Sequence, residues 1–317
     1  MSPKTLNESL LLAVEGKETS LTFPQEASEV PLFNKDIPIV PAAIVKPETA
    51  QQVAAIVKCA VERGLKVQAK SGGHSYANHG FGGLNGSIVV DTTKLNHLSM
   101  DTETYTATVG GGCLLGDLAQ FLYKYGRAMP HGTWPGVGLG GHATTGGIGP
   151  ASRMWGLTLD HVIGVEVVLA DSSIVDASED KNSDLFFAIK GAAASFGIVT
   201  QFRLRTHVAP GECVRFQHTM ESFDVATRSE WFKMWQRLMA DPLLSRFLSV
   251  GLEVFPQKMV IGGNYFRSKK DFDDLDLLAA LPSGGTYQET VAATWIDMVD
   301  GWAEGIRTES QMISFSS

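Results

Sequence analysis

The chain has 317 residues, 44% of them hydrophobic and 19% charged, with a mean hydropathy of +0.03, which excludes a largely disordered protein and allows one large or two ordinary globular domains. Its net charge of −8 argues against binding to a nucleic-acid backbone, and because it has no run of 18 apolar residues we expect no membrane partner. The sequence has three cysteines, an odd number, and no two of them form a CxxC motif. Neither a zinc site nor a disulfide framework is therefore predicted, and no metal is assigned.

The first predicted elements are a helix and a strand. Residues 45–64 have the pattern of an amphipathic helix, with Thr49 and Gln52 as a capping box and Gly64 as the terminating residue. The apolar run at residues 65–69 follows as a strand. Together they lead the chain into a loop that contains two adjacent glycines.

This loop, residues 70–80, is called the first glycine segment, and its sequence KSGGHSYANHG places two glycines directly before His74. Ser-Gly-Gly is a common turn signal, so these residues alone are compatible with an ordinary tight loop and an exposed histidine. Two strands at residues 87–91 and 105–112 and a helix at residues 114–126 are predicted after it. The reason for an imidazole at the turn stays open at this point.

Residues 131–149, called the second glycine segment, contain eight glycines in nineteen residues. We expect this density to exclude a helix interior, and glycine lets backbone N–H groups approach a ligand, so the segment is a candidate anion-binding loop. A flexible linker is the alternative, although Trp134, Leu139 and Ile148 are unusual for one. Neither segment has the GxGxxG pattern of a dinucleotide fold, but the two together could close on the two ends of one elongated phosphate-bearing ligand.

The rest of the chain is predicted to contain further strands and a domain boundary. Residues 164–178 have the pattern of a hairpin that turns at residues 171–173, and residues 197–208 alternate as a strand. Composition changes after Pro210, where we place the boundary. The second part is predicted to hold two helices (229–239 and 271–281), two strands (248–254 and 260–266) and an irregular end (305–317).

Several of these motifs, in this order, resemble a known family. SGGHSYANHGFGG, HGTWPGVGLGGHATTGGIG and NSDLFFAIKGAAASFGIVTQFRLR are similar to the berberine-bridge-enzyme-like flavoproteins of the vanillyl-alcohol-oxidase superfamily, most densely to fungal oligosaccharide oxidases, over residues 41–208. The resemblance implies FAD as cofactor and an α+β fold. It places a PCMH-type FAD-binding domain of two α/β subdomains at residues 1–210, and a partial antiparallel-sheet substrate domain, without the family's C-terminal segment, at residues 211–317.

The resemblance also implies the cofactor-binding residues. His74 matches the histidine that members join to the 8α-methyl group of FAD, and a neutral imidazole nitrogen suits that role. Ser71, Gly72, Gly73 and Ser75 would contact the phosphates. Further FAD contacts are implied in the second glycine segment and a later strand, at Trp134, Gly136, Gly138, Gly140, Gly141, His142, Gly146, Gly147, Gly149, Gly197, Ile198 and Val199.

Three of the matched positions have two interpretations or depart from the family. Trp134 stands where bicovalent members have the cysteine that bonds flavin C6, so a thioether at this position is excluded, and the indole lies near the flavin or turns away. His142 matches a histidine near the ribityl and pyrimidine end of the flavin, or caps local backbone. Tyr76 matches a tyrosine beside the substrate in sugar-oxidising relatives, or simply packs as an aromatic ring.

The implied activity is FAD-dependent oxidation of a hydroxyl-bearing carbon, with hydride transfer to flavin N5 and reoxidation by oxygen or another acceptor. The expected substrate is a small molecule, either a saccharide oxidised to its lactone or a fungal secondary-metabolite alcohol. No catalytic base is assigned, because relatives continue past the end of this chain with a segment that supplies one; His79, Asp297 and Tyr265 are speculative choices. The alternatives are a truncated flavin-binding protein with impaired turnover and a carrier of some other phosphate ligand.

The compartment is also left open. The apolar stretch at residues 9–14 is too short for a convincing secretion signal, which taken alone predicts an intracellular chain. Sugar-oxidising relatives are commonly secreted, and the two expectations point in opposite directions.

Overall fold

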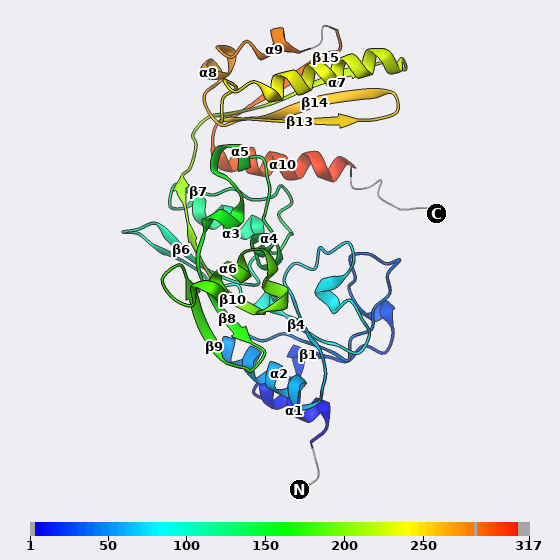
Figure 1. Cartoon of the computed structure of the whole chain (residues 1–317), viewed down its shortest axis with the longest axis vertical. Helices are drawn as coiled ribbons and strands as arrows, with labels where there is room; N and C mark the ends of the chain where they lie inside the picture. The colour runs from blue at the N-terminus through cyan, green and yellow to red at the C-terminus, as the bar shows by residue number, and fades with distance from the viewer. Residues whose placement is uncertain (1–3, 282–283, 310–317) are drawn as a thin grey trace. The chain divides into compact units, whose positions relative to one another are not determined.

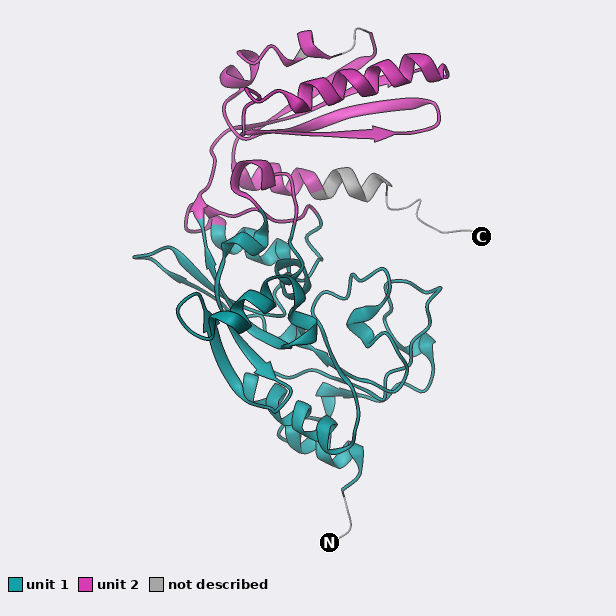
Figure 2. Cartoon of the chain, in the orientation of Figure 1, with its two compact units in different colours: residues 1–122, 134–147, 157–206 teal, residues 123–133, 148–156, 207–317 magenta. Residues whose placement is uncertain are grey.

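The computed structural model describes residues 4–281 and 284–309, without the side chains of residue 278 and residues 303–309. Figure 1 shows the chain by its helices and strands, and Figure 2 colours its two compact units. Unit 1 comprises residues 1–122, 134–147 and 157–206, and unit 2 comprises residues 123–133, 148–156 and 207–317. The second glycine segment is therefore divided between the units.

The first sheet of unit 1 has the strand order β1-β2-β4-β3. Its strands are β1 (Leu21–Thr22), β2 (Ala43–Val45), β3 (Val67–Lys70) and β4 (Ile88–Asp91). The last three are parallel, whereas β1 is antiparallel to β2. Helix α2 (Ala50–Glu62) connects β2 to β3, and with α1 (Leu6–Ala13) it belongs to a core that includes Val53 and Ile56, both fully buried. This arrangement places the ends of β3 and β4 side by side.

The second sheet of unit 1 is antiparallel, with the order β5-β6-β10-β8-β9. Its strands are β5 (Leu98–Asp101), β6 (Thr106–Gly110), β8 (Val162–Leu169), β9 (Ile174–Ser178) and β10 (Gly197–Arg205). The helices that accompany it in the chain are α3 (Leu115–Tyr123), α4 (Leu139–Thr144) and α6 (Ser183–Ala192). Helix α6 contains a kink at Lys190 and Gly191, where the backbone is not helical.

Unit 2 is built on an antiparallel sheet with the order β13-β14-β12-β15. Its strands are β12 (Cys213–Glu221), β13 (Leu248–Val254), β14 (Lys258–Tyr265) and β15 (Thr286–Ala292), and β7 (Arg127–Ala128) pairs separately with β11 (His207–Val208). Its helices are α5 (Ser152–Trp155), α7 (Val225–Ala240), α8 (Lys269–Asp273), α9 (Leu277–Ala280) and α10 (Trp295–Glu309). Val214, Phe216 and Ile261 belong to its core.

Most of the predicted helices and strands are confirmed, and so is the predicted α+β fold class. Helix α2 ends within two residues of the predicted Gly64, which has a φ of +64°. Its predicted capping box is only half formed: the Thr49 hydroxyl accepts the Gln52 N–H at 3.2 Å, but the Gln52 side chain accepts the N–H of Glu48 instead of that of Thr49. The strands predicted at 87–91, 164–178 and 197–208 are β4, β8 with β9, and β10.

Three predictions about helices are wrong. The second glycine segment does contain a short helix, α4, because its glycines allow close packing: a Cβ on Gly140 would lie 2.7 Å from the carbonyl oxygen of Gly111. The single helix predicted at 271–281 is split into α8 and α9 by Asp276, whose φ of +45° lies in the left-handed region. The predicted irregular end is helical as far as Glu309, and residues 310–317 lie outside the described residues.

The predicted boundary at Pro210 lies just after unit 1 ends at residue 206, but unit 2 also takes in residues 123–133 and 148–156 from the first part. No helix in the described part of the chain combines the length and apolar character needed to cross a bilayer. Within the same residues, no group of three or more His, Cys, Asp or Glu side chains is placed to hold a metal ion.

Candidate functional site

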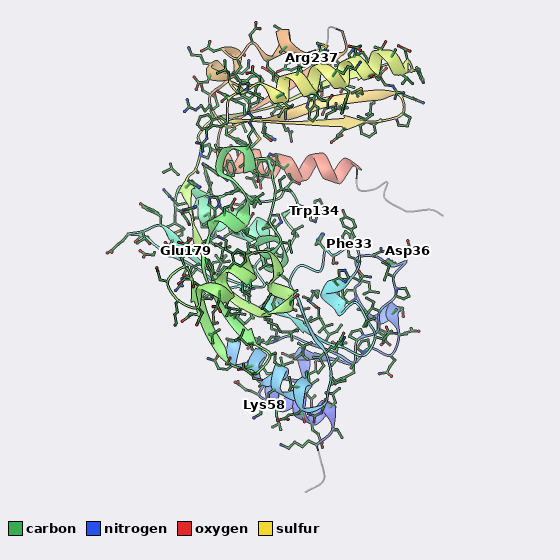
Figure 3. All side chains as sticks on the ribbon, viewed as in Figure 1. Phe33, Asp36, Lys58, Trp134, Glu179 and Arg237 are labelled. Carbon is green, nitrogen blue, oxygen red and sulfur yellow. The ribbon has the colours of Figure 1, made fainter. Side chains whose placement is uncertain are left out.

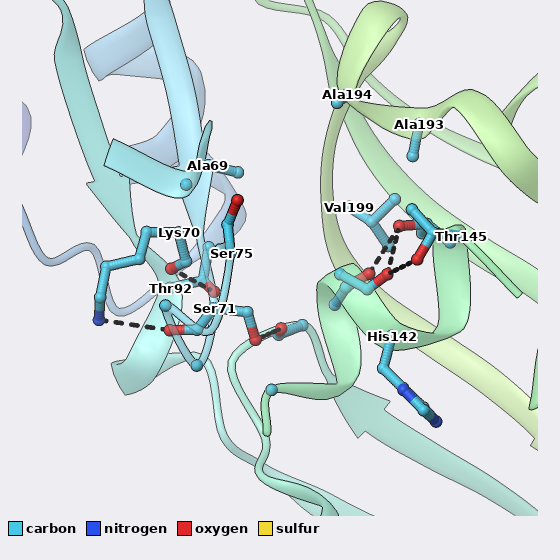
Figure 4. Close-up of a pocket in the computed structure, with 18 of the residues that line it drawn as sticks. Ala69, Lys70, Ser71, Ser75, Thr92, His142, Thr145, Ala193, Ala194 and Val199 are labelled. Atoms are coloured by element: carbon cyan, nitrogen blue, oxygen red, sulfur yellow. Dashed lines mark hydrogen bonds between the residues drawn. The ribbon is translucent and has the colours of Figure 1, made fainter. Parts of the chain in front are cut away.

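Both glycine segments line one cavity of about 500 Å³ in unit 1. In Figure 4, Ser71, Ser75 and Thr92 lie on one wall, and His142, Thr145 and Val199 lie on the other. The lining comes from residues 68–75, 79–80, 92, 111, 137–138, 140–142, 144–145, 193–194, 197 and 199. Separate stretches of the chain thus converge on this cavity, and its volume falls in the range of small-molecule and cofactor sites.

The two glycine segments touch each other where Gly72 meets Gly138. A Cβ on Gly72 would lie 2.2 Å from the nitrogen of Gly138, and a Cβ on Gly138 would lie 2.1 Å from the nitrogen of Gly72. Any side chain at either position would force the backbones apart. The sequence suggested that the segments lie at two ends of a ligand, whereas the structure brings them into direct contact.

The first glycine segment offers unpaired hydrogen-bond donors to the cavity. Gly73 has a φ of +74°, in the left-handed region that glycine adopts without strain. Among the described residues, the backbone N–H groups of Gly73, His74 and Ser75 have no hydrogen-bond acceptor. All three residues line the cavity. Successive free N–H groups around a residue of positive φ form a concave anion site, which suits a phosphate or diphosphate.

The loop is held from behind by polar contacts. The Ser71 hydroxyl donates to the carbonyl of Gly111 at 2.9 Å, which joins the first glycine segment to the end of β6. The Lys70 ammonium forms an ion pair with Asp91, with 3.2 Å between Nζ and Oδ2. Thr92, which follows β4, donates its hydroxyl hydrogen to the carbonyl of Lys70 at 3.2 Å. The loop geometry therefore depends on the ends of three strands.

His74 lies half-buried in the cavity lining and has aromatic neighbours. Its ring centroid is 4.9 Å from that of Phe33, and its Nε2 is 3.6 Å from the position that a Cβ on Gly136 would take. Burial lowers the pKa of His74 below its ordinary value of about 6.5. At neutral pH the imidazole is therefore uncharged and keeps one ring nitrogen free to act as a nucleophile or hydrogen-bond acceptor.

Trp134 lies beside this histidine without lining the cavity. Its Nε1 is 3.0 Å from the position that a Cβ on Gly136 would take, the same position that His74 Nε2 approaches. Figure 3 labels Trp134 and Phe33. Tyr76, the aromatic residue predicted to lie beside the substrate, is 74% exposed. It packs edge-on against Phe33, with the two ring centroids 5.3 Å apart.

The remaining predicted contacts divide into two groups. Ser71, Gly72, Gly73, Ser75, Gly138, Gly140, Gly141, His142, Gly197 and Val199 line the cavity together with His74. Gly136, Gly146, Gly147, Gly149 and Ile198 do not line it. Gly147 packs under His142, since a Cβ there would lie 2.9 Å from the ring, and Gly149 belongs to unit 2, where a Cβ would clash with the carbonyl oxygen of His131.

Sequence reasoning missed Lys70, Thr92 and Gly111, which also line the cavity. Part of a signal for the first two was present, because they directly follow the strands predicted at residues 65–69 and 87–91. The structure adds that these strands are parallel neighbours, and the carboxyl ends of such strands form the edge at which α/β sheets bind ligands. Gly111 is the middle residue of the glycine triplet 110–112, which in the sequence indicates only the end of a strand. It faces the cavity because β6 pairs with β10 in the other sheet.

The three residues considered as catalytic bases lie in different surroundings. His79 lines the cavity and is exposed. Tyr265 is buried in the core of unit 2, where burial raises its pKa. Asp297 is an exposed residue of α10 whose carboxylate accepts the Thr294 hydroxyl at 2.7 Å. Neither Tyr265 nor Asp297 lines the cavity of the glycine segments.

Unit 2 has a second cavity, of about 540 Å³, along its sheet. Its uncharged polar and aromatic lining includes Thr133, Gln217, Asn264, Gln288, Thr290 and Trp302. The Trp302 indole donates to the Asn264 side-chain oxygen at 3.0 Å. Arg215, Glu253, Lys258 and Glu289 contribute charges of both signs. Side-chain amides, hydroxyls and an indole together suit a ligand with many hydroxyl groups.

Comparison with known proteins yields a consistent set of relatives. Residues 41–178 match the FAD binding domain family model. The FAD-linked oxidoreductase sorD of Penicillium rubens is 47% identical over 272 residues, which are 84% of this chain and 57% of that protein. This chain therefore spans little more than half the length of that relative.

Two solved structures share the fold. The carbohydrate oxidase from Microdochium nivale, in complex with a substrate analogue, has a TM-score of 0.86 and 36% identity over 95% of this chain and 64% of its own. The glucooligosaccharide oxidase from Acremonium strictum has a TM-score of 0.85 and 33% identity over 95% of this chain and 63% of its own, and it carries a 6-S-cysteinyl, 8α-N1-histidyl FAD.

Proposed function

The chain belongs to the berberine-bridge-enzyme-like FAD-linked oxidoreductases, and from this premise we propose that unit 1 binds FAD in the cavity of the glycine segments, with His74 as its covalent 8α anchor. The observation that supports this most is the position of His74. It is a neutral, half-buried imidazole next to free backbone N–H groups in one cavity. Those groups are suited to the two kinds of contact that FAD needs, one to its diphosphate and one to its ring.

The cavity fits FAD by its construction. The contact between Gly72 and Gly138 leaves no room for side chains, which gives the diphosphate direct access to the backbone. Ser71, Gly73 and Ser75 would hold the diphosphate, and Gly197 and Val199 line the same cavity. Bound FAD would supply the redox chemistry, since its ring takes up a hydride from the substrate carbon. The protein's part is to bind the cofactor, orient it and exclude water.

His74 and Trp134 together suggest a single covalent bond to the cofactor. The Acremonium strictum relative has both a histidyl and a cysteinyl bond to its FAD. Trp134 has no thiol to form the second bond, and its indole packs next to Gly136 on the side that His74 approaches. We therefore assign His74 alone to the attachment.

For the substrate we propose a small molecule with a hydroxyl-bearing carbon, first a saccharide oxidised to its lactone and second a secondary-metabolite alcohol. The amide, hydroxyl and indole groups of the second cavity support a saccharide. A carbohydrate oxidase and a glucooligosaccharide oxidase are among the relatives of known structure, whereas sorD supports the second choice only as an FAD-linked oxidoreductase. Oxygen or another acceptor would take up the electrons.

A second candidate function is flavin binding without complete turnover. Among the described residues that line the FAD cavity, the titratable side chains are Lys70, His74, His79 and His142, with no carboxylate and no tyrosine. Removal of a proton from a substrate hydroxyl needs a positioned base of suitable pKa. Reduction of the bound flavin by a panel of sugars, followed without oxygen as loss of the yellow colour, distinguishes the two candidates, since the second predicts none.

The attachment is tested by acid precipitation of the protein purified with FAD. We expect a yellow pellet from the unaltered chain and a colourless pellet from His74→Ala, with the flavin released into the supernatant. His79→Ala is the matched control, because it removes another histidine of the same cavity and should leave the pellet yellow. Flavin retained in the His74→Ala pellet would contradict the assignment of His74.

A further inference from the structure

Lys70 is a cavity residue to which the proposed function gives no role. It is the last residue of β3, and its side chain is only 12% exposed. Its ammonium pairs with Asp91 at the end of β4, and the Asp91 side chain is 7% exposed. Partly buried ion pairs are costly to desolvate and add little net stability, so a role beyond stability is worth seeking.

The Lys70 side chain contacts the first glycine segment at two points. Its Nζ donates to the carbonyl oxygen of Ser71 at 3.3 Å, and its Cε lies 3.0 Å from the place that a Cβ on Gly73 would take. The C=O and N–H groups of one planar peptide point in opposite directions. Holding the Ser71 carbonyl toward Lys70 therefore also fixes the direction of the Gly72 N–H.

The lysine itself is held in place by β4 and the residues after it. Asp91 uses Oδ2 for Lys70 and Oδ1 to accept the N–H of Thr93 at 3.2 Å. Thr92 donates to the Lys70 carbonyl at 3.2 Å, and the Phe81 ring centroid lies 5.9 Å from Nζ. The ammonium is thus engaged by Asp91 and Ser71, which suits a supporting position behind the loop.

We propose that Lys70 is a positioning residue for the diphosphate of FAD. By fixing the Ser71–Gly72 peptide and packing against Gly73, it holds the start of the loop in the conformation whose free N–H groups can receive an anion, which lowers the entropic cost of binding. Lys70 itself also lines the cavity proposed for FAD. The inference rests on the proposed function, because it presupposes that FAD occupies this cavity.

The test uses the full chain in a His74→Ala background, where flavin binding is reversible. Affinities for FAD and for riboflavin, which has no diphosphate, are measured by titration. We expect Lys70→Met to weaken FAD binding about tenfold or more, equivalent to about 1.4 kcal/mol, and riboflavin binding by less than about twofold. Lys70→Arg keeps the charge and should retain most of the FAD affinity.

Two further variants keep the test decisive. Lys181→Met is the matched control, because Lys181 forms an ion pair with Asp176 in which the side chains are 62% and 50% exposed, and it should change neither affinity. If Lys70→Met does not fold, the double variant Lys70→Met/Asp91→Asn replaces it in the titrations, because it also removes the buried carboxylate that Lys70→Met leaves unpaired. Equal losses for both flavins, or no loss of FAD affinity, would overturn the role of Lys70. A His74→Ala reference that binds no FAD would instead overturn the proposed function and the inference with it.

Discussion

At the scale of single residues, the environment of His74 is set by a segment far from it in sequence. Asn78 is fully buried, and its side-chain amide donates to the carbonyls of Asn34 and Ile37 at 2.6 and 2.8 Å. Its side-chain oxygen accepts the N–H of Asn34 at 3.1 Å. This pairing secures the segment that places Phe33 over His74. Local sequence patterns could not predict it, because they carry no information about which distant segments meet.

We predict that Phe33→Ala raises the pKa of His74 toward its ordinary value of about 6.5. Phe33 helps to bury the imidazole, and burial disfavours the charged form. An NMR titration of the apoprotein measures the pKa, with Phe223→Ala, an aromatic residue 77% exposed in unit 2, as control. An unchanged His74 pKa would show that Phe33 does not contribute to the burial.

The same shift predicts how stability depends on pH. In the unaltered chain the folded-state pKa of His74 lies below the unfolded value, so the unfolded state binds the proton first as the pH falls below about 6.5. The contribution of the neutral imidazole is therefore present at neutral pH and declines as the pH falls toward the folded-state pKa. We expect the free energy of unfolding, measured with urea, to decrease between pH 7 and pH 5 by a smaller amount in Phe33→Ala than in the unaltered chain.

A second residue-scale prediction concerns Trp134→Cys. Trp134 and His74 approach the same position at Gly136, so a thiol at residue 134 would lie close to the proposed attachment point. We expect this variant to form a second covalent link to FAD. Mass spectrometry of proteolytic peptides reads this out as flavin on the peptide of residue 134 as well as on that of His74. Flavin on the His74 peptide alone would mean that the backbone at residue 134 is placed differently from that of bicovalent relatives.

At the scale of elements, the site forms where strand ends and glycine segments meet. Periodicity was sufficient to predict α2 and several strands, among them β4, β8 and β10, and glycine density was sufficient to identify both segments. Strands β2, β5, β12 and β15 were not predicted. Periodicity could not show that Lys70 and Thr92 line the same cavity. Their proximity follows from the strand order β2-β4-β3, which the residues next to each of them do not encode. Periodicity also missed α4, where tertiary packing of small residues outweighs the low helix propensity of glycine.

The contact between the segments can be tested with Gly138→Ala. The new methyl group would lie 2.1 Å from the Gly72 nitrogen and 2.2 Å from the Ser71 hydroxyl oxygen, so the two segments must separate. We expect FAD incorporation to fall at least about tenfold and stability to fall by roughly 1–3 kcal/mol, as for other overpacked sites. Gly211→Ala is the control, since a Cβ there meets nothing within 4 Å. Normal FAD incorporation in Gly138→Ala would show that the contact is not needed for binding.

At the scale of the whole molecule, the two units interleave along the chain. The predicted boundary at Pro210 relied on a change of composition, which can mark where one domain ends but not where the chain returns to it. Residues 123–133 and 148–156 belong to unit 2 because β7 pairs with β11 and because α5 lies against the unit 2 sheet, with Arg153 donating to the carbonyl of Leu244 at 3.0 Å. These partners are distant in sequence.

This division predicts where bound FAD should slow hydrogen exchange. All residues that line the proposed FAD cavity belong to unit 1. In the His74→Ala protein, FAD at about 100 times its dissociation constant should stabilise the folded protein by about 2.7 kcal/mol. Amide hydrogens that exchange only after FAD has dissociated should therefore exchange about 100-fold more slowly. We expect this slowing in peptides covering residues 71–75 and 138–145. Peptides of β13 and β14 in unit 2 should be unchanged, and equal slowing there would mean that unit 2 also contributes to cofactor binding.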